Sequence, residues 1–232
     1  MLVTDPYLGW ILSGLLWTIL VAAAGWIIAL VLGTVIGIAR TVRSRVVRAL
    51  AAVYVEVFRN IPLLVQIFLF YFVLPEVLPR AAGRWLKREL PEPEFWTAVV
   101  SLGLYTACRV AEQVRSGIQS IPQGQTFAGL ATGLTRRQVY RWIILPVAYR
   151  TTIPAFTSEF LNIFKNSSLA LTIGVLELTS RTRQVSEQTF HPIEAFAAAS
   201  GLYALITLII TLLMSVVERR LRIPGTIAME AR

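Results

Sequence analysis

The sequence is poor in the residues that build disulfide frameworks, metal sites and soluble surfaces. Its 232 residues include one cysteine, Cys108, and one histidine, His191. A single cysteine excludes an intramolecular disulfide, and a lone histidine with no second histidine or cysteine near it argues against a metal site. Charged residues make up 15% of the chain, against about 25% in an ordinary soluble domain. A soluble single-domain enzyme is therefore excluded.

Lysine is also scarce. The only two, Lys87 and Lys165, are not preceded by glycine, so the chain lacks the G-x-x-x-x-G-K-[ST] loop that cradles nucleotide phosphates. No nucleophile–base pair stands out either. We expect no enzymatic activity and no bound cofactor. The net charge of +9 does not indicate nucleic-acid binding, because the basic residues lie between apolar segments.

Hydrophobic residues make up 56% of the chain, and the mean hydropathy is +0.65. Residues 6–39 and 195–217 contain no charged residue, and each run exceeds the ~20 residues that a helix needs to cross a bilayer. Apolar segments predict membrane helices at about 10–39, 50–75, 95–115, 151–175 and 195–217. The sequence therefore predicts an all-α membrane protein, with residues 1–232 forming one transmembrane domain. No basic residue precedes the first apolar run, so we expect that span to be retained rather than cleaved as a signal peptide.

Basic residues indicate the orientation of these five spans. If the N-terminus lies outside, the inner segments hold 13 lysines and arginines and the outer segments hold 6. Because cytoplasmic segments collect basic residues, this bias predicts N-out and C-in. The segment 76–94, bounded by prolines, is then an outer loop or surface helix.

Three polar side chains share one face of the third span. Tyr105, Arg109 and Glu112 follow one another at steps of four and three residues. Arg109 lies roughly 21 Å into a ~30 Å hydrocarbon layer, where a charge is costly. Two interpretations are compatible: an internal ion pair with Glu112, or a cation exposed to a translocation path.

Two other spans carry polar side chains at helical spacing, which predicts a wet face on each. We expect Glu56 and Arg59 to form an ion pair, with gating as the alternative. Lys165 is expected to pair with Glu159 or with a carbonyl group. The residues concerned are Glu56, Arg59, Asn60 and Gln66 in the second span, and Ser158, Glu159, Asn162, Lys165, Asn166 and Thr172 in the fourth.

The inner segment 116–149 is too polar for another crossing and predicts a helix–turn–helix. Thr135 and Gln138 have capping-box spacing, opening a helix that we expect to end before Pro146. The segment also holds apolar residues that either meet a partner or fold back on the chain's own bundle. These are Phe127, Leu130, Leu134, Val139 and Tyr140.

Part of this segment resembles the "EAA loop" of ABC importer permeases, which in that family docks in a cleft of the ATPase. Gly133, Ile143, Leu145 and Pro146 match the G-x9-I-x-L-P part of that loop. The runs 54–66, 118–125 and 164–169 resemble the polar amino-acid permease subfamily, and the resemblance covers about residues 10–225. The run 106–115, together with Asn60, is most similar to glutamate/aspartate permeases. One departure is that the family's acidic residue falls on Phe127, which removes that polar contact.

The resemblance implies a permease subunit of an ATP-driven importer in the bacterial cytoplasmic (inner) membrane. It would accept polar, mainly acidic, amino acids from a periplasmic binding protein, beside a second permease subunit, identical or paralogous, and two ATPase subunits that use the ATP. A permease for another polar amino acid such as glutamine, and an ion-coupled carrier or channel, stay open as alternatives. The resemblance implies ATPase coupling through Gln125, Phe127, Ala128, Gly129, Gly133, Leu134, Ile143, Leu145 and Pro146.

For substrate, the predicted site centres on Arg109. We expect its guanidinium group to pair with a substrate carboxylate and asparagine amides to supply further hydrogen bonds. Lys165 is included as a candidate, although lysine at this motif position also occurs in permeases for cationic amino acids. The asparagines are Asn60, Asn162 and Asn166.

Overall fold

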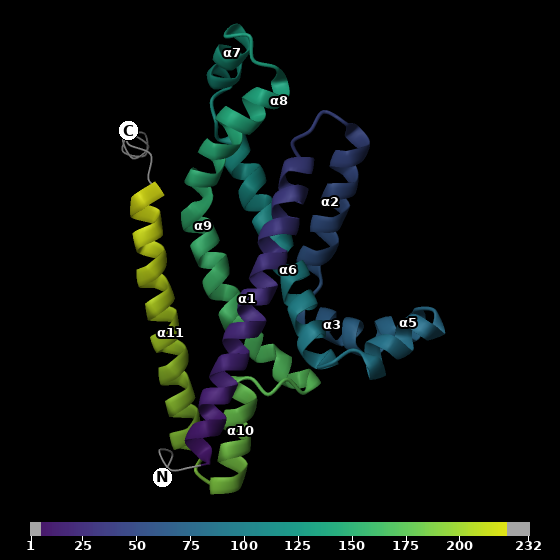
Figure 1. The fold of residues 1–232 in the computed structure, drawn as a ribbon, viewed down its shortest axis with the longest axis vertical. Helices are drawn as coiled ribbons and strands as arrows, with labels where there is room; N and C mark the ends of the chain where they lie inside the picture. Colours follow the sequence, from purple (N-terminus) through teal and green to yellow (C-terminus); the bar gives the residue numbers. More distant parts are fainter. Residues whose placement is uncertain (1–5, 222–232) are drawn as a thin grey trace.

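The structure is a computed structural model that describes residues 6–221, and its regular elements within that range are all helices. Four long helices run lengthwise through an elongated bundle: α1 (Tyr7–Ala39), α6 (Pro93–Gln119), α9 (Leu145–Asn166) and α11 (Pro192–Leu221) (Figure 1). We call the end that carries α7 (Gln123–Ala131) and α8 (Arg136–Val139) the upper end. The end near α10 (Leu178–Thr189) is the lower end. The predicted all-helical class is confirmed.

Helical segments occupy all five predicted spans, but the second span is not one continuous helix. Helices α1 and α11 are each long and apolar enough to cross a membrane. The second span is broken: α2 (Arg45–Asn60) and the segment Leu63–Val77 meet at a bend of 103° and qualify only together. The prediction of a continuous helix over 50–75 is therefore wrong. Five crossings and an N-out orientation stay predictions.

The break in the second span follows from Pro62. The residue before a proline avoids the α conformation, and Ile61 and Pro62 are both extended, with ψ of 126° and 139°. The Gln66 side chain closes the corner by donating hydrogen bonds from Nε2 to the carbonyl groups of Phe58 and Ile61, both at 2.9 Å. The sequence placed Gln66 on a wet face, but its side chain is instead buried at this bend.

Two other prolines do not stop their helices, because a π-helical turn precedes each. The π-helix η1 (Leu69–Val73) leads into α4 (Leu74–Val77), which contains Pro75, and η3 (Tyr140–Ile144) leads into α9, which contains Pro146. A proline ring clashes with the carbonyl group four residues earlier, and here that carbonyl lies in the wider π turn.

As a result, α8, η3 and α9 form one uninterrupted helical run from Arg136 to Asn166. The prediction that the helix opened by Thr135 ends before Pro146 is wrong. The predicted capping box is confirmed, because the Thr135 and Gln138 side chains each bond the other residue's backbone N–H.

Helices α1 and α6 pack closely because glycines face the contact. A Cβ atom at Gly33 would lie 2.6 Å from Cβ of Val110, and one at Gly37 would lie 2.7 Å from the carbonyl oxygen of Ala111. Contacts this short do not occur between real side chains, so only glycine fits. Elsewhere along the bundle a core forms from α1, α3 (Leu63–Phe68), α6 and α9, and it includes Val21, Ile67, Leu102 and Ile163.

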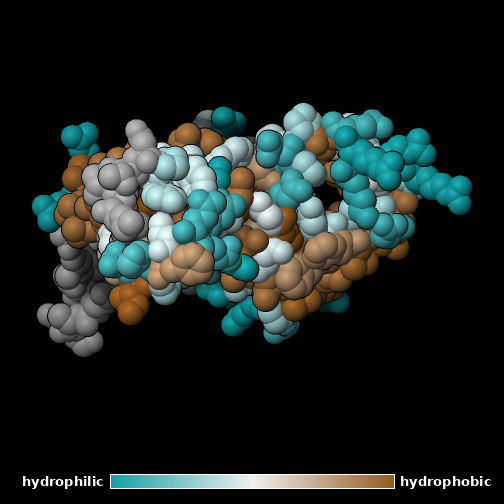
Figure 2. All heavy atoms as spheres, turned by 90° about the horizontal axis from the view of Figure 1, so that it is seen from below, coloured by the Kyte–Doolittle hydropathy of each residue, from teal (hydrophilic) through white to brown (hydrophobic). Residues whose placement is uncertain are grey.

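The predicted outer segment contains short helices, α5 (Arg80–Arg84) and the π-helix η2 (Trp85–Glu89), which project sideways from the bundle (Figure 1). Seen from the lower end, hydrophilic side chains gather on the side of α5 (Figure 2). After α9, a 3-10 helix, η4 (Ser167–Ile173), ends at Gly174 with φ of +97°.

Helix α10 was not predicted, because it is short and polar. It begins after Glu177, a fully buried residue whose carboxylate accepts hydrogen bonds from the backbone N–H groups of Thr179 and Ser180. The hydroxyl group of Tyr203 on α11 donates a third hydrogen bond to it at 2.9 Å. This carboxylate therefore joins α10 to α11.

Candidate functional site

Arg109 projects from α6 and is held by two neighbours. Its Nη2 donates a hydrogen bond to the hydroxyl oxygen of Tyr105 at 3.1 Å, and its guanidinium carbon lies 5.3 Å from the centre of the Tyr105 ring. Its Nη1 lies 3.6 Å from Oε1 of Glu159 on α9. The Arg109 side chain is 46% exposed, so part of the guanidinium group stays accessible.

The partner of Arg109 is therefore Glu159 and not Glu112, three residues away on the same helix. Glu112 is occupied elsewhere, because it pairs with Arg40 and, at 2.8 Å, with Arg115. The proposed pairing of Arg109 with Glu112 is wrong. Sequence spacing could not reveal the contact with Glu159, since the two residues lie on different helices, although each was assigned to a wet face.

Glu159 is poorly satisfied for a buried carboxylate. Its side chain is 10% exposed, and Oε2 is buried without a hydrogen-bond partner. The distance of 3.6 Å from Oε1 to Arg109 exceeds the 2.7–2.9 Å typical of a charge-assisted hydrogen bond. The pair is thus an electrostatic contact without a strong hydrogen bond. A carboxylate at a shorter distance could compete with Glu159 for Arg109.

Asn60 is the last residue of α2 and lies at the corner between α2 and α3. Its amide Nδ2 donates to the Glu56 carbonyl oxygen at 2.7 Å and to Glu56 Oε2 at 3.3 Å. Within residues 6–221 no ion pair joins Glu56 to Arg59, and both side chains are exposed. The prediction of a Glu56–Arg59 pair is wrong. Helix α2 packs on α6 through Val55, Cys108 and Ala111, next to Arg109.

Asn162 and Asn166 follow Glu159 at steps of three and four residues, so they share its face of α9. Both side chains are half-buried. Lys165 belongs elsewhere: it lines an open groove of about 750 Å³ with hydroxyl-bearing residues of α11, including Tyr203 and Thr207. The expected pairing of Lys165 with Glu159 is not found, because the carboxylate of Glu159 contacts Arg109.

The upper segment, residues 123–144 with α7, α8 and η3, combines packed and exposed apolar side chains. Leu130, Leu134, Val139 and Tyr140 pack against the bundle core, as the alternative of folding back predicted. Phe127 does not, and it is 63% exposed. Trp142, which the sequence pattern did not single out, is 57% exposed on the same segment.

The turn between α7 and α8 depends on two glycines. Gly133 has φ of +82°, a left-handed conformation that favours glycine. A Cβ atom at Gly129 would lie 2.8 Å from Ile143 Cδ1, so the glycine lets α7 approach η3. The predicted coupling residues therefore lie together at the upper end: Gln125, Phe127, Ala128 and Gly129 in α7, Gly133 and Leu134 in the turn, and Ile143, Leu145 and Pro146 in η3 and α9.

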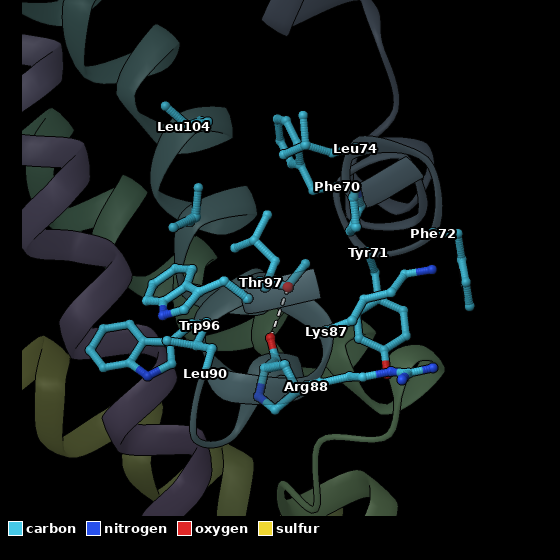
Figure 3. Close-up of a pocket in the computed structure, with 15 residues that line it drawn as sticks. Phe70, Tyr71, Phe72, Leu74, Lys87, Arg88, Leu90, Trp96, Thr97 and Leu104 are labelled. Carbon is cyan, nitrogen blue, oxygen red and sulfur yellow. Dashed lines mark hydrogen bonds between the residues drawn. The ribbon is translucent and has the colours of Figure 1, made fainter. Parts of the chain in front are cut away.

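The largest hollow among the described pockets contains none of the predicted site residues. It measures about 850 Å³ and lies between the segment 70–75, η2 and α6. Most lining side chains are apolar or aromatic, with Lys87 and Arg88 on one side and Trp96 and Leu90 on the other (Figure 3). Lys87 already pairs with Glu76. A hollow with so little hydrogen-bonding capacity does not suit a zwitterionic amino acid, and we assign the site to Arg109 instead.

Comparisons with known proteins show the family of the chain. The family of inner membrane components of binding-protein-dependent transport systems matches residues 29–223. The chain is 47% identical over 221 residues to the glutamate/aspartate import permease protein GltJ of Escherichia coli strain K12, covering 94% of this chain and 90% of that protein. It is 35% identical over 222 residues to the nopaline transport system permease protein NocM of Agrobacterium fabrum strain C58, covering 90% and 89%.

Solved structures show the same fold. A crystal structure of an amino acid ABC transporter with histidines superposes with a TM-score of 0.79 at 28% identity, covering 92% of this chain and 95% of that chain. An inward-facing MetNI methionine ABC transporter gives a TM-score of 0.75 at 18% identity, covering 95% and 100%. The second likeness concerns the fold alone.

Proposed function

We propose a function from the premise that this chain belongs to the family of inner membrane components of binding-protein-dependent transport systems. It is a permease subunit of an ATP-driven importer that moves acidic amino acids, glutamate and aspartate, across the inner membrane. The permease named for these two substrates is 47% identical over most of both chains. The apolar helices α1 and α11 are long enough to cross that membrane.

The observation that carries the substrate assignment is the accessible guanidinium group of Arg109. It projects from a membrane helix, is 46% exposed, and has only a 3.6 Å contact with a carboxylate. A substrate carboxylate can take the place of Glu159 by forming shorter, charge-assisted hydrogen bonds. The guanidinium group of Arg109 also offers two parallel hydrogen-bond donors to a planar carboxylate.

Asparagine amides complete the proposed site. Asn162 and Asn166 lie on the Glu159 face of α9, and Asn60 lies at the corner of the broken second span. Amide groups can both donate to a carboxylate and accept from an ammonium group, which suits the zwitterionic part of an amino acid. Lys165 faces α11 in a separate groove, and we therefore give it a lesser role than Arg109.

ATP hydrolysis belongs to separate ATPase subunits, which we propose dock on the upper segment. Phe127 and Trp142 are exposed there, whereas their apolar neighbours are packed inward. Large exposed aromatic side chains at a packed surface are typical of interaction sites. We propose the complete importer holds a second permease subunit, identical or paralogous, two ATPases and a periplasmic amino-acid-binding protein, and that this chain binds no cofactor. In this assembly the chain lies N-out and C-in.

Substrate uptake into proteoliposomes tests the proposal. The permease would be reconstituted with its ATPase and binding protein, with and without internal ATP, and offered glutamate, aspartate, glutamine and arginine. We expect ATP-dependent uptake of the acidic pair. Uptake of arginine or glutamine instead would contradict the assignment to acidic substrates, and uptake without ATP would contradict an ATP-driven importer.

Arg109→Tyr tests the residue itself. Loss of a hydrogen-bonded charge costs about 1.5–3 kcal/mol, so glutamate uptake at low substrate concentration should fall roughly 10- to 150-fold. Arg88→Gln removes an exposed arginine outside the proposed site and should leave uptake unchanged. Basal ATP hydrolysis by the reconstituted complex shows whether each variant assembles. Unchanged glutamate uptake by Arg109→Tyr would remove Arg109 from the substrate site.

A further inference from the structure

The upper ends of α1, α2 and α6 enclose a second hollow, lined by arginines. It measures about 470 Å³, and its charged lining consists of Arg40, Arg45, Arg48 and Arg115. Arg40 follows the end of α1, Arg45 and Arg48 lie in the first turn of α2, and Arg115 lies near the end of α6. Two consecutive helices, α1 and α2, and the distant end of α6 therefore bring four guanidinium groups together. The predicted substrate and coupling residues are not among them.

Positive charge is in excess around this hollow. Glu112 is the carboxylate that serves it, pairing with Arg40 and with Arg115, whose Nε donates to Oε2 at 2.9 Å. Arg115 Nη1 also donates to Gln119 Oε1 at 2.6 Å, which satisfies that guanidinium group. Glu56 and Arg59 also act on Arg40, with one charge of each sign, so the four arginines and Glu112 leave a net excess of three positive charges.

Arg45 and Arg48 supply most of this excess. Neither forms an ion pair within the part of the chain that the structure describes, and both side chains are exposed. They stand three residues apart, so they occupy one face of α2. Ala49 and Ala52 line the same hollow, and their small side chains leave it open.

Arg40 is partly buried close to the other positive charges of the hollow. Its side chain is 15% exposed. Burial, and after it the positive charge of Arg115, lowers the pKa of Arg40 below its ordinary value. An anion in the hollow would offset this repulsion and replace the lost hydration.

The position of the hollow indicates where such an anion comes from. It lies where three membrane helices end, and the adjoining face of α2 exposes Val46, Leu50 and Val53. An anionic headgroup could sit among the arginines while its acyl chains lie along these apolar side chains. Basic pockets between membrane helices are a known means of binding phosphate-bearing lipids.

We propose that this arginine hollow binds the phosphate group of an anionic phospholipid. Guanidinium groups present paired donors that match phosphate oxygens, and Arg45 and Arg48 have donors to spare. The inference depends on the proposed function only in placing this end of the bundle at headgroup level. It does not depend on which amino acid is transported.

The test is native mass spectrometry of the full chain, purified with the subunits that accompany it. The probes are phosphatidylglycerol and, as a zwitterionic control, phosphatidylcholine with the same acyl chains. Each basic residue near an anionic surface changes binding roughly fivefold, so Arg45→Gln with Arg48→Gln should weaken phosphatidylglycerol binding roughly 25-fold. Arg219→Gln with Arg220→Gln removes the same charge from α11 and should have little effect.

Three results would overturn the proposal. Equal binding of the two lipids would mean that the headgroup charge is not recognised. Undiminished phosphatidylglycerol binding by the α2 variant would place the lipid elsewhere. Competition by inorganic phosphate, with thermal stabilisation by phosphate alone and none by the lipid, would assign the hollow to a free phosphate. The thermal midpoint of the α2 variant in nonionic detergent checks folding, and transport assays are not needed, so this result is independent of the proposed function.

Discussion

The close packing of α1 on α6 makes a prediction that can be worked out atom by atom. We consider Gly33→Ala, Gly37→Ala and the double variant. The new Cβ at position 33 would lie 2.6 Å from Cβ of Val110, about 0.8 Å short of ordinary contact at 3.4 Å. At position 37 the shortest contact would be 2.7 Å, to the carbonyl oxygen of Ala111, about 0.7 Å short.

Neither clash can be relieved by turning a side chain. Position 33 also meets the carbonyl oxygen of Ala107 at 2.8 Å, so at both positions the α6 backbone itself is in the way. The two helices must separate, which opens the packed seam. Overpacking of this kind costs about 1–3 kcal/mol, and we expect a loss of about 2 kcal/mol in unfolding free energy for each single variant.

Helix propensity does not compensate for this loss. Alanine normally favours a helix over glycine by about 1 kcal/mol. In a membrane, however, separated helices stay helical because their backbone groups have no water to bind. The double variant should lose only about 3 kcal/mol, because one separation of the helices relieves both clashes.

Unfolding in mixed micelles, followed by tryptophan fluorescence, measures these differences. Gly9→Ala is the matched control: it lies on the same helix, and nothing lies within 4 Å of its Cβ position. If Gly33→Ala is no less stable than Gly9→Ala, the seam is not as tight as described. Strictly additive losses in the double variant would refute a single rigid separation of the two helices.

Three further predictions concern two buried polar side chains and one exposed helix cap. Glu177→Ala strands two backbone N–H groups and removes one of the two hydrogen bonds of the Tyr203 hydroxyl, which keeps its bond with Thr179, so the free energy of unfolding should fall by about 3 kcal/mol. Glu177→Gln should lose less, and equal losses would contradict the role of the carboxylate. Gln66→Leu strands two carbonyl groups at the bend but also removes the buried, unpartnered Oε1 of Gln66, so the free energy of unfolding should fall by about 2 kcal/mol. An unchanged melting temperature would show that the bend does not need these two hydrogen bonds. Thr135→Ala removes one side of the capping box with Gln138, costing about 1 kcal/mol locally. Reconstituted Thr135→Ala complexes should show reduced substrate-stimulated ATP hydrolysis at unchanged thermal stability, and normal stimulation would contradict a role of this turn in coupling.

Local sequence patterns predicted the helices that depend on local physics. The apolar segment at about 10–39 predicted α1 with its start three residues late and its end correct, and the Thr135–Gln138 spacing predicted the cap of α8. Prolines were harder to interpret. Pro62 breaks its span, whereas Pro146 and Pro154 lie within α9, and the π turn that spares Pro146 has no clear sequence signal.

Partner choice could not be predicted for the buried charges. Glu112 is nearer to Arg109 in sequence than Glu159 is, yet the fold places Arg40 and Arg115 against Glu112. Which face of one helix meets which face of another depends on packing across the bundle, and spacing along a single helix does not contain that information. The same reason explains why the arginine hollow was not foreseen.

The unbroken helical run from Arg136 to Asn166 has a mechanical consequence. Glu159 lies 23 residues beyond Arg136, which is about 35 Å along a helix rising 1.5 Å per residue. If the run behaves as a stiff lever arm, a tilt of about 5° at its base displaces Glu159 by about 3 Å. That displacement is comparable to the 3.6 Å separating Glu159 from Arg109. A small tilt at the upper end would thus be sufficient to change the distance between Glu159 and Arg109, and with it the competition between Glu159 and a bound carboxylate for the guanidinium group. No separate movement of the residues between them would be needed.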